Sequence, residues 1–197
     1  VNIDPCDVCN FKCDFCFQCK NTGFKGSMMT VDMFERAIEQ LKAFENPINV
    51  IQLFALGEPL LNSNVPLFIR RIRQENVAKE VKITTNGSVL THKLIDEMME
   101  AGLDELIISL NGLCDADFKR IANTKVSFDD MYDNIKYLYA HKRDCHVHIK
   151  IIGDYFSKEE QKFFVDQMED YADTINIDGV TNHWSGIAST EKEQQQY

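Results

Sequence analysis

Residues 9–16 read Cys9-Asn-Phe-Lys-Cys13-Asp-Phe-Cys16, and this stretch decides how the rest of the chain is interpreted. Its cysteines have the spacing C-x3-C-x2-C, and five of the seven cysteines of the chain lie between Cys6 and Cys19. A disulfide framework in a secreted protein spreads its cysteines along the chain. One crowded group therefore indicates a metal or iron–sulfur site. Three thiolates from one loop can hold three irons of a [4Fe–4S] cluster and leave the fourth iron open to a small molecule.

Two other interpretations of these cysteines stay open. Cys13-x2-Cys16-x2-Cys19 begins like a ferredoxin run, but a glycine stands where that run needs its fourth cysteine. Cys6-x2-Cys9 together with Cys13-x2-Cys16 supplies four thiolates of the kind that hold structural zinc, although only three residues separate the two pairs. We expect the open cluster, with Cys9, Cys13 and Cys16 as ligands and with Cys6 and Cys19 as reduced bystanders.

The composition is that of an ordinary globular chain and excludes several classes of protein. The 197 residues are 44% hydrophobic and 26% charged, which predicts one domain rather than a low-complexity or disordered chain. A formal charge of −10 repels a phosphate backbone, so we expect no nucleic-acid partner. No apolar run approaches the roughly 20 residues of a membrane helix. The N-terminus carries no signal segment, so we expect a cytoplasmic protein with no membrane association.

From about residue 30 onward, the hydrophobic pattern alternates between helical and strand periods. Helices are predicted after the caps Thr30, Thr91, Ser127 and Ser157, and a further helix has Pro66 in its first turn. Strands are predicted at residues 1–4, 49–55, 80–85, 105–110, 146–151 and 174–180.

Strands that alternate with helices predict an α/β fold with a parallel sheet. A complete eightfold barrel takes about 250 residues, so we expect a partial (β/α)6 TIM-like barrel with an N-terminal iron–sulfur cluster loop. The barrel domain is assigned to residues 1–187. Residues 188–197 are expected to be a polar tail that leads to a C-terminal domain outside this chain.

The cysteine motif, with Phe15 before its third cysteine, resembles the signature of the radical S-adenosylmethionine (radical SAM) superfamily. Three further stretches, each after a predicted strand, resemble the family's GGEP, TNG and S-x-D-G motifs in the right order: Leu56-Gly57-Glu58-Pro59, Thr85-Asn86-Gly87 and Ser109-Leu-Asn111-Gly112. Leu56 replaces the first glycine of GGEP, and Asn111 replaces the aspartate of the last motif. Within the superfamily, the pattern is most like the branch that contains SPASM or twitch domains.

This resemblance implies an enzyme and its cofactors, a [4Fe–4S] cluster and S-adenosylmethionine (SAM). The enzyme would cleave SAM reductively to a 5′-deoxyadenosyl radical that abstracts hydrogen from a small polar molecule or a peptide. Reactions of oxidoreductase, epimerase and peptide- or sugar-modifying type are known in this superfamily. An electron donor such as flavodoxin or ferredoxin is implied as a partner. The alternative from another class is a non-catalytic iron–sulfur or zinc protein for electron transfer or scaffolding.

The resemblance also implies the residues that bind SAM. The family binds the amino group of SAM through the GGEP segment, here Gly57, Glu58 and Pro59. Other residues in this expected set lie at strand ends or near the cluster; they are Phe15, Asn86, Ser109, Asn111 and Arg120. Cys114 is a candidate hydrogen donor, although a small buried thiol is the plainer interpretation.

The strands themselves predict a polar interior. In residues 146–151, Val147, Ile149 and Ile151 share one face, which leaves His148 and Lys150 on the other. Helices must cover the apolar face, so the polar face points into the barrel. We therefore expect His148 and Lys150 as catalytic residues in the SAM and substrate cavity. His183 and Trp184 are expected at its rim.

Overall fold

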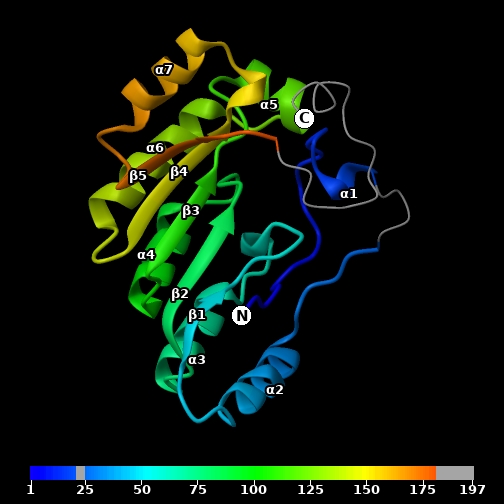
Figure 1. Ribbon diagram of the computed structural model, residues 1–197, viewed down its shortest axis with the longest axis vertical. Coiled ribbons are helices and arrows are strands. Elements are labelled where there is room, and N and C mark those ends of the chain that lie inside the picture. Colours follow the sequence, from blue (N-terminus) through cyan, green and yellow to red (C-terminus); the bar gives the residue numbers. More distant parts are fainter. Residues whose placement is uncertain (21–24, 181–197) are drawn as a thin grey trace, which may run out of the picture.

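Five parallel strands stand in chain order in the computed structural model, which describes residues 1–20 and 25–180 (Figure 1). Each neighbouring pair is hydrogen-bonded, and the sheet stays open rather than closing into a barrel. The strands are β1 (Ile48–Gln52), β2 (Ala78–Thr85), β3 (Glu105–Ser109), β4 (His146–Ile152) and β5 (Thr174–Asp178). The α/β partial barrel is confirmed.

The prediction of a first strand at residues 1–4 is wrong, so the sheet has five strands rather than six. This segment lies beside β1 but forms only one parallel bridge, between Asn2 and Gln52. The next backbone N–H that would face β1 belongs to residue 5. That residue is Pro5, which has no N–H to donate, so the ladder cannot continue.

Most helices begin where their capping residues predict. The helices are α1 (Phe17–Lys20), α2 (Val31–Leu41), α3 (Val65–Gln74), α4 (His92–Ala101), α5 (Asp115–Ala122), α6 (Phe128–His141) and α7 (Lys158–Met168), with short 3-10 turns η1 (Pro59–Leu61) and η2 (Gly153–Tyr155). The side chains of Thr30, Thr91 and Ser127 each accept a backbone N–H of the first helical turn, and Ser157 forms a capping box with Glu160.

Sequence reasoning missed α1 and α5. The helix α5 begins after Cys114, whose side chain makes no capping hydrogen bond, so the usual start signal is absent.

The predicted boundary at residues 187 and 188 lies outside the described residues, as do His183 and Trp184.

Helices cover one face of the sheet and supply the core (Figure 1). On that face the strands carry side chains with no exposed surface, among them Val81, Ile83, Leu106, Ile108, Val147 and Ile149. Buried apolar residues of α3, α4, α6 and α7 complete this core. The helix α2 joins it through Phe34, which stacks on Phe68 with ring centroids 4.1 Å apart.

The other face of the sheet is polar, as the alternation predicts. In register across the strands, Gln52 pairs with Lys82, Lys82 with Glu105, and Glu105 with His146. Closer to the carboxyl ends, Ser109 pairs with Lys150, which pairs with Asn176. The cysteine-bearing N-terminal segment and α1 lie across from this face (Figure 1).

Candidate active site at the carboxyl ends of the strands

A cavity of about 770 Å³ opens where the strands end. One wall belongs to the cysteine loop, defined here as residues 9–16, and to the beginning of α1. The remaining wall comes from the carboxyl end of every strand, through residues 54–58, 84–86, 109–111, 150–152 and 177–180. In barrels of parallel strands this is the end at which active sites lie.

The cysteine loop places Cys9, Cys13 and Cys16 on this cavity. A turn joins two of them, since the Cys16 N–H donates to the Cys13 carbonyl at 3.0 Å. The loop rests on the end of α5 through a hydrogen bond from Lys12 N–H to the Ala122 carbonyl at 2.9 Å. The three thiols therefore face one space from a loop that is anchored on its outer side.

The protein environment of Cys9 and Cys13 disfavours their thiolate forms. Burial raises the pKa of Cys9 and of Cys13, and the neighbouring thiols raise the pKa of Cys13 further. Thiolates must form before they bind metal, and cluster irons would supply positive charge that stabilises the thiolates. Three clustered thiols next to an open cavity fit a [4Fe–4S] cluster with one iron free.

Within residues 1–20 and 25–180, no three Cys, His, Asp or Glu side chains converge as the ligands of a single metal ion do. A cubane cluster has a different requirement, because each of its thiolates bonds a different iron. Cys6 is fully buried, its thiol donates to the Val8 carbonyl at 3.4 Å, and it does not line the cavity. The side chain of Cys19 lies outside the description.

Gly57 brings the loop after β1 directly against the N-terminal segment. A Cβ atom at this position would overlap the backbone of Cys6 and Val8. The next residue closes the contact, because the Glu58 N–H donates to the Val8 carbonyl at 2.8 Å. Asp4 supports the same loop by accepting the Leu56 N–H at 2.9 Å. A glycine is therefore required here for close backbone approach.

Glu58 connects two loops rather than presenting a free carboxylate. It is only 2% exposed, and it accepts from the Leu60 N–H at 3.0 Å, the Thr85 hydroxyl at 2.7 Å and the Asn86 N–H at 2.7 Å. Burial raises its pKa, whereas these three donors act in the opposite direction. The resemblance implied that the Gly57-Glu58-Pro59 segment binds the amino group of SAM, but the Glu58 carboxylate accepts three hydrogen bonds from the protein itself. Glu58 positions the loop whose residues 54–57 line the cavity.

Asn86 lies between β2 and the cysteine loop. Its Nδ2 is 3.8 Å from Cys9 Sγ and 3.0 Å from Asn10 Oδ1. Its Oδ1 accepts the Ser88 N–H at 2.9 Å. Asn10 and Ser88 were not among the expected site residues, because only the folded loops bring them together.

The other expected SAM-binding residues divide into two groups. Phe15, Ser109 and Asn111 line the cavity, and the Phe15 ring packs on Tyr155 at 5.6 Å between centroids. Pro59 and Arg120 do not line it. Pro59 is buried at the first position of η1.

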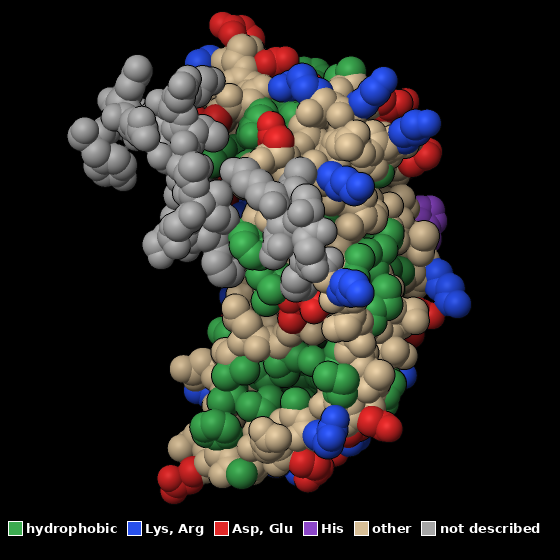
Figure 2. Space-filling view, turned by 90° about the vertical axis from the view of Figure 1, so that its right-hand side faces the viewer, with side chains coloured by type: hydrophobic (Ala, Val, Ile, Leu, Met, Phe, Trp, Pro, Cys, Tyr) green, Lys and Arg blue, Asp and Glu red, His purple; other side chains and the backbone are tan. Residues whose placement is uncertain are grey.

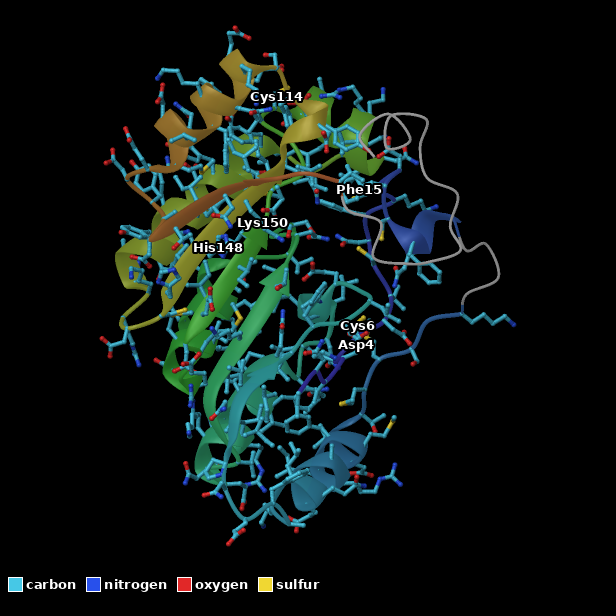
Figure 3. All side chains as sticks on the ribbon, in the orientation of Figure 1. Asp4, Cys6, Phe15, Cys114, His148 and Lys150 are labelled. Carbon is cyan, nitrogen blue, oxygen red and sulfur yellow. The ribbon has the colours of Figure 1, made fainter. Side chains whose placement is uncertain are left out.

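Lys150 lines the cavity, but His148 does not. Figure 3 shows both on β4, with Lys150 closer to Phe15. Two residues along a strand amount to about 7 Å, which leaves His148 below the cavity floor. There the Nδ1 atom of His148 lies 3.8 Å from Oε1 of Glu105. Lys150 pairs instead with Asp178 at 3.0 Å, an inner-face residue that was not among the expected site residues.

Cys114 and Arg120 lie away from the cavity, on α5 and its N-cap. Cys114 is exposed, and its thiol is 3.4 Å from Asp117 Oδ2. Arg120 is exposed as well and pairs with Asp117 at 2.7 Å. Figure 3 shows Cys114 apart from Lys150 and Phe15. Cys114 does not line the cavity, so it is not in position to donate hydrogen there. Arg120 does not line the cavity either, and it forms its ion pair with Asp117 on the surface of α5.

An open α/β barrel with three cysteines at the carboxyl ends of its strands has the arrangement expected of an iron–sulfur protein. The Radical SAM superfamily model matches residues 3–165, so the chain belongs to the radical SAM superfamily. The predicted family is confirmed. Membership implies a [4Fe–4S] cluster and SAM as cofactors.

Two curated relatives are both named for GTP 3′,8-cyclase activity. A probable GTP 3′,8-cyclase of Methanococcus maripaludis is 31% identical over 121 residues, which are 61% of this chain and 38% of that protein. A GTP 3′,8-cyclase of Staphylococcus haemolyticus is 26% identical over 188 residues, which are 90% of this chain and 52% of that protein. The chain thus spans about half or less of the length of these relatives.

Among solved structures, Streptococcus suis SuiB bound to S-adenosylmethionine has the same fold. The TM-score is 0.74 at 19% sequence identity, over 94% of this chain and 41% of SuiB. At this sequence identity, the likeness shows the fold alone.

Proposed function

We propose that this chain is the catalytic core of a radical SAM enzyme that acts on a small polar molecule or a peptide. The observation that carries the proposal is the position of Cys9, Cys13 and Cys16 on the same cavity as the carboxyl ends of all five strands. When bound, the cluster and SAM supply reductive cleavage of the C–S bond, which gives methionine and a 5′-deoxyadenosyl radical that abstracts hydrogen from the substrate. The protein holds the reacting groups in place and keeps water out.

The residues of the chain take distinct parts in this proposal. Phe15 offers an aromatic face beside the cluster, and Ser109 and Asn111 offer polar groups for SAM. Lys150 is proposed to contact the substrate, because it lines the cavity from the strand side, across from the cysteine loop. A Lys150→Ala enzyme that binds and turns over its substrate like the parent would contradict this role.

The relatives support a second candidate reaction, the cyclisation of a purine nucleoside triphosphate. The charges on the cavity support the first candidate better. Among the described lining residues, the charged side chains are Glu58, Lys150 and Asp178, and the single lysine is paired with the aspartate. A triphosphate carries several negative charges and is held by several cations. GTP bound by the reconstituted chain in preference to peptides would reverse this choice.

The competing class is a non-catalytic iron–sulfur or zinc protein, and one experiment separates the two. The chain is reconstituted anaerobically with iron and sulfide, reduced with dithionite and titrated with SAM. We expect the electron paramagnetic resonance (EPR) signal of the cluster to change and 5′-deoxyadenosine to form. An unchanged signal without 5′-deoxyadenosine, or zinc bound in place of iron, would contradict the proposal.

The proposed partners beyond the substrate follow from the same chemistry. An electron donor such as flavodoxin or ferredoxin would reduce the cluster. On the face drawn in Figure 2, basic side chains are scattered among acidic ones. The absence of a nucleic-acid partner stays a prediction. No helix in residues 1–20 and 25–180 is long and apolar enough to cross a membrane. The cytoplasm as the compartment stays a prediction.

A further inference from the structure

The side chain of Asn86 reaches from the end of β2 to the sulfur of Cys9. The Nδ2–Sγ distance is 3.8 Å, and Asn86 is only 7% exposed. We propose that Asn86 donates a hydrogen bond to the Cys9 thiolate and thereby raises the reduction potential of the [4Fe–4S] cluster. This inference rests on the proposed function and assigns Asn86 to the cluster rather than to SAM.

The orientation of the Asn86 amide follows from its neighbours. Its Oδ1 accepts the Ser88 N–H at 2.9 Å and the Ser88 hydroxyl at 2.6 Å. A backbone N–H can only donate, so the amide oxygen must face Ser88. Asn10 Nδ2 in turn donates to the Ser88 hydroxyl at 2.8 Å. The network is consistent throughout and leaves the NH₂ group of Asn86 toward Cys9.

The backbone of Asn86 is held as firmly as its side chain. Its N–H donates to Glu58 at 2.7 Å, and Glu58 also holds the Thr85 hydroxyl at 2.7 Å. The same hydroxyl accepts the Gly87 N–H at 3.0 Å. The buried carboxylate therefore fixes the turn from which the amide reaches Cys9, so the donor is in place before the cluster binds.

The effect on the cluster follows from charge. A reduced cluster carries one more negative charge than an oxidised one, and part of that charge resides on the thiolate sulfurs. A donor at a sulfur therefore stabilises the reduced form more than the oxidised form. The low exposure of Asn86 strengthens this electrostatic contribution. Removal of the donor should make the cluster harder to reduce.

The test compares midpoint potentials of the reconstituted chain by EPR-monitored redox titration without SAM. The variants are Asn86→Ala, which removes the donor, and Asn86→Asp, which places an oxygen against the sulfur. At a fixed solution potential, we expect Asn86→Ala to lower the ratio of reduced to oxidised cluster about tenfold, the effect of one charge-assisted hydrogen bond. For a one-electron couple, tenfold corresponds to about 59 mV. Asn86→Asp should shift the potential further in the same direction.

The matched control is Asn10→Ala. It removes the other acceptor of the Asn86 amide, at 3.0 Å, but leaves the donor to Cys9 in place. Its potential should stay near that of the parent. The affinity for SAM is measured alongside, because a SAM-binding role of Asn86 would change that affinity and leave the potential unchanged.

Two results would overturn the inference. One is an Asn86→Ala cluster with the potential of the parent. The other is loss of iron loading in both Asn86→Ala and Asn86→Ser while circular dichroism shows folded proteins, because Asn86 would then serve assembly rather than tuning. If the parent chain assembles no SAM-responsive cluster, the proposed function itself fails, a result distinct from both.

Discussion

The Glu58 carboxylate accepts a hydrogen bond from the Thr85 hydroxyl at 2.7 Å, which ties the loop after β1 to the end of β2. These loops form adjacent parts of the cavity wall. A side chain that follows one strand therefore sets the position of residues that follow the next. The glutamate of the Gly57-Glu58-Pro59 turn therefore has a structural role, in which its hydrogen bonds hold two loops of the site together.

We expect Glu58→Gln to lower the free energy of unfolding of the apoprotein by about 1–3 kcal/mol. In the glutamine, an NH₂ group replaces one of the two acceptor oxygens. If it replaces Oε2 it faces the Asn86 N–H, and if it replaces Oε1 it faces the Leu60 N–H and the Thr85 hydroxyl, so a donor meets a donor in either case. Urea denaturation measures the difference. The control is Glu45→Gln, at an exposed position between α2 and β1, which should unfold like the parent. Equal stability of the Glu58 and Glu45 variants would show that the tie is not structural.

Gly57→Ala is expected to disrupt the cavity wall and to destabilise the fold by about 1–3 kcal/mol, the typical cost of overpacking. Its Cβ would overlap the backbone of Cys6 and Val8, which cannot move away as a flexible side chain can. Thermal denaturation and iron loading provide the measurements.

Gly179→Ala is the matched control for this substitution. Its nearest contact to an added Cβ would be Asp154 Oδ2, at an ordinary 3.8 Å. It should melt like the parent. If Gly57→Ala also melts and loads iron like the parent, the close approach is not needed.

The cluster ligands are expected to be Cys9, Cys13 and Cys16. Alanine at any of these positions should abolish iron and sulfide loading after anaerobic reconstitution, because a cluster on two thiolates is held poorly. Cys6→Ala should load iron like the parent, since its thiol is buried away from the cavity. Loss of iron in Cys6→Ala together with its retention in Cys9→Ala would mean that the register of the motif is wrong.

The stability of the protein should respond to protonation of His148. Burial lowers the pKa of its ring below the ordinary value of 6.5. Its Nε2 is buried and has no hydrogen-bond partner among the described residues, so an added proton finds no acceptor there. Glu105 opposes this shift, as does Asp178, whereas Lys150 and His146 reinforce it.

The sign of the pH effect follows from that shift. A folded-state pKa below the unfolded value means that stability is fully present above pH 6.5 and is lost as the pH falls toward the folded pKa. We therefore expect the parent to lose stability relative to His148→Gln below pH 6.5, and the difference to be constant above it. Urea titrations of both proteins from pH 5 to about pH 8 measure this difference. A difference that does not change with pH would place His148 in a solvated setting.

Much of the architecture could be read from local sequence. Hydrophobic periods located the five strands, and Thr30, Thr91, Ser127 and Ser157 located helix starts, because these signals act within a few residues of the chain. The exceptions have local causes. Pro5 ends a pairing that alternation alone would extend, and α5 lacks a capping hydrogen bond at its start.

The polar face of each strand, and the residue types where each strand ends, follow from local sequence alone. The pleat repeats every two residues, so alternation assigned Lys150 and His148 to the same face without any knowledge of the fold. The cysteine spacing likewise favoured an iron–sulfur cluster over zinc, since three thiolates from one loop suit such a cluster; membership of the family supports this class of cofactor.

Which of these residues reach the cavity and which support it depends on contacts between distant parts of the chain. Lys150 lines the cavity and His148 does not, because the cavity lies at the carboxyl ends of the strands and Lys150 is two residues closer to that end of β4. The Glu58 carboxylate links two loops instead of remaining free for a ligand, because the Thr85 hydroxyl and the Asn86 N–H at the end of β2 donate hydrogen bonds to it. These contacts join residues 27 and 28 positions apart in the chain, and no local pattern encodes a distance of that kind.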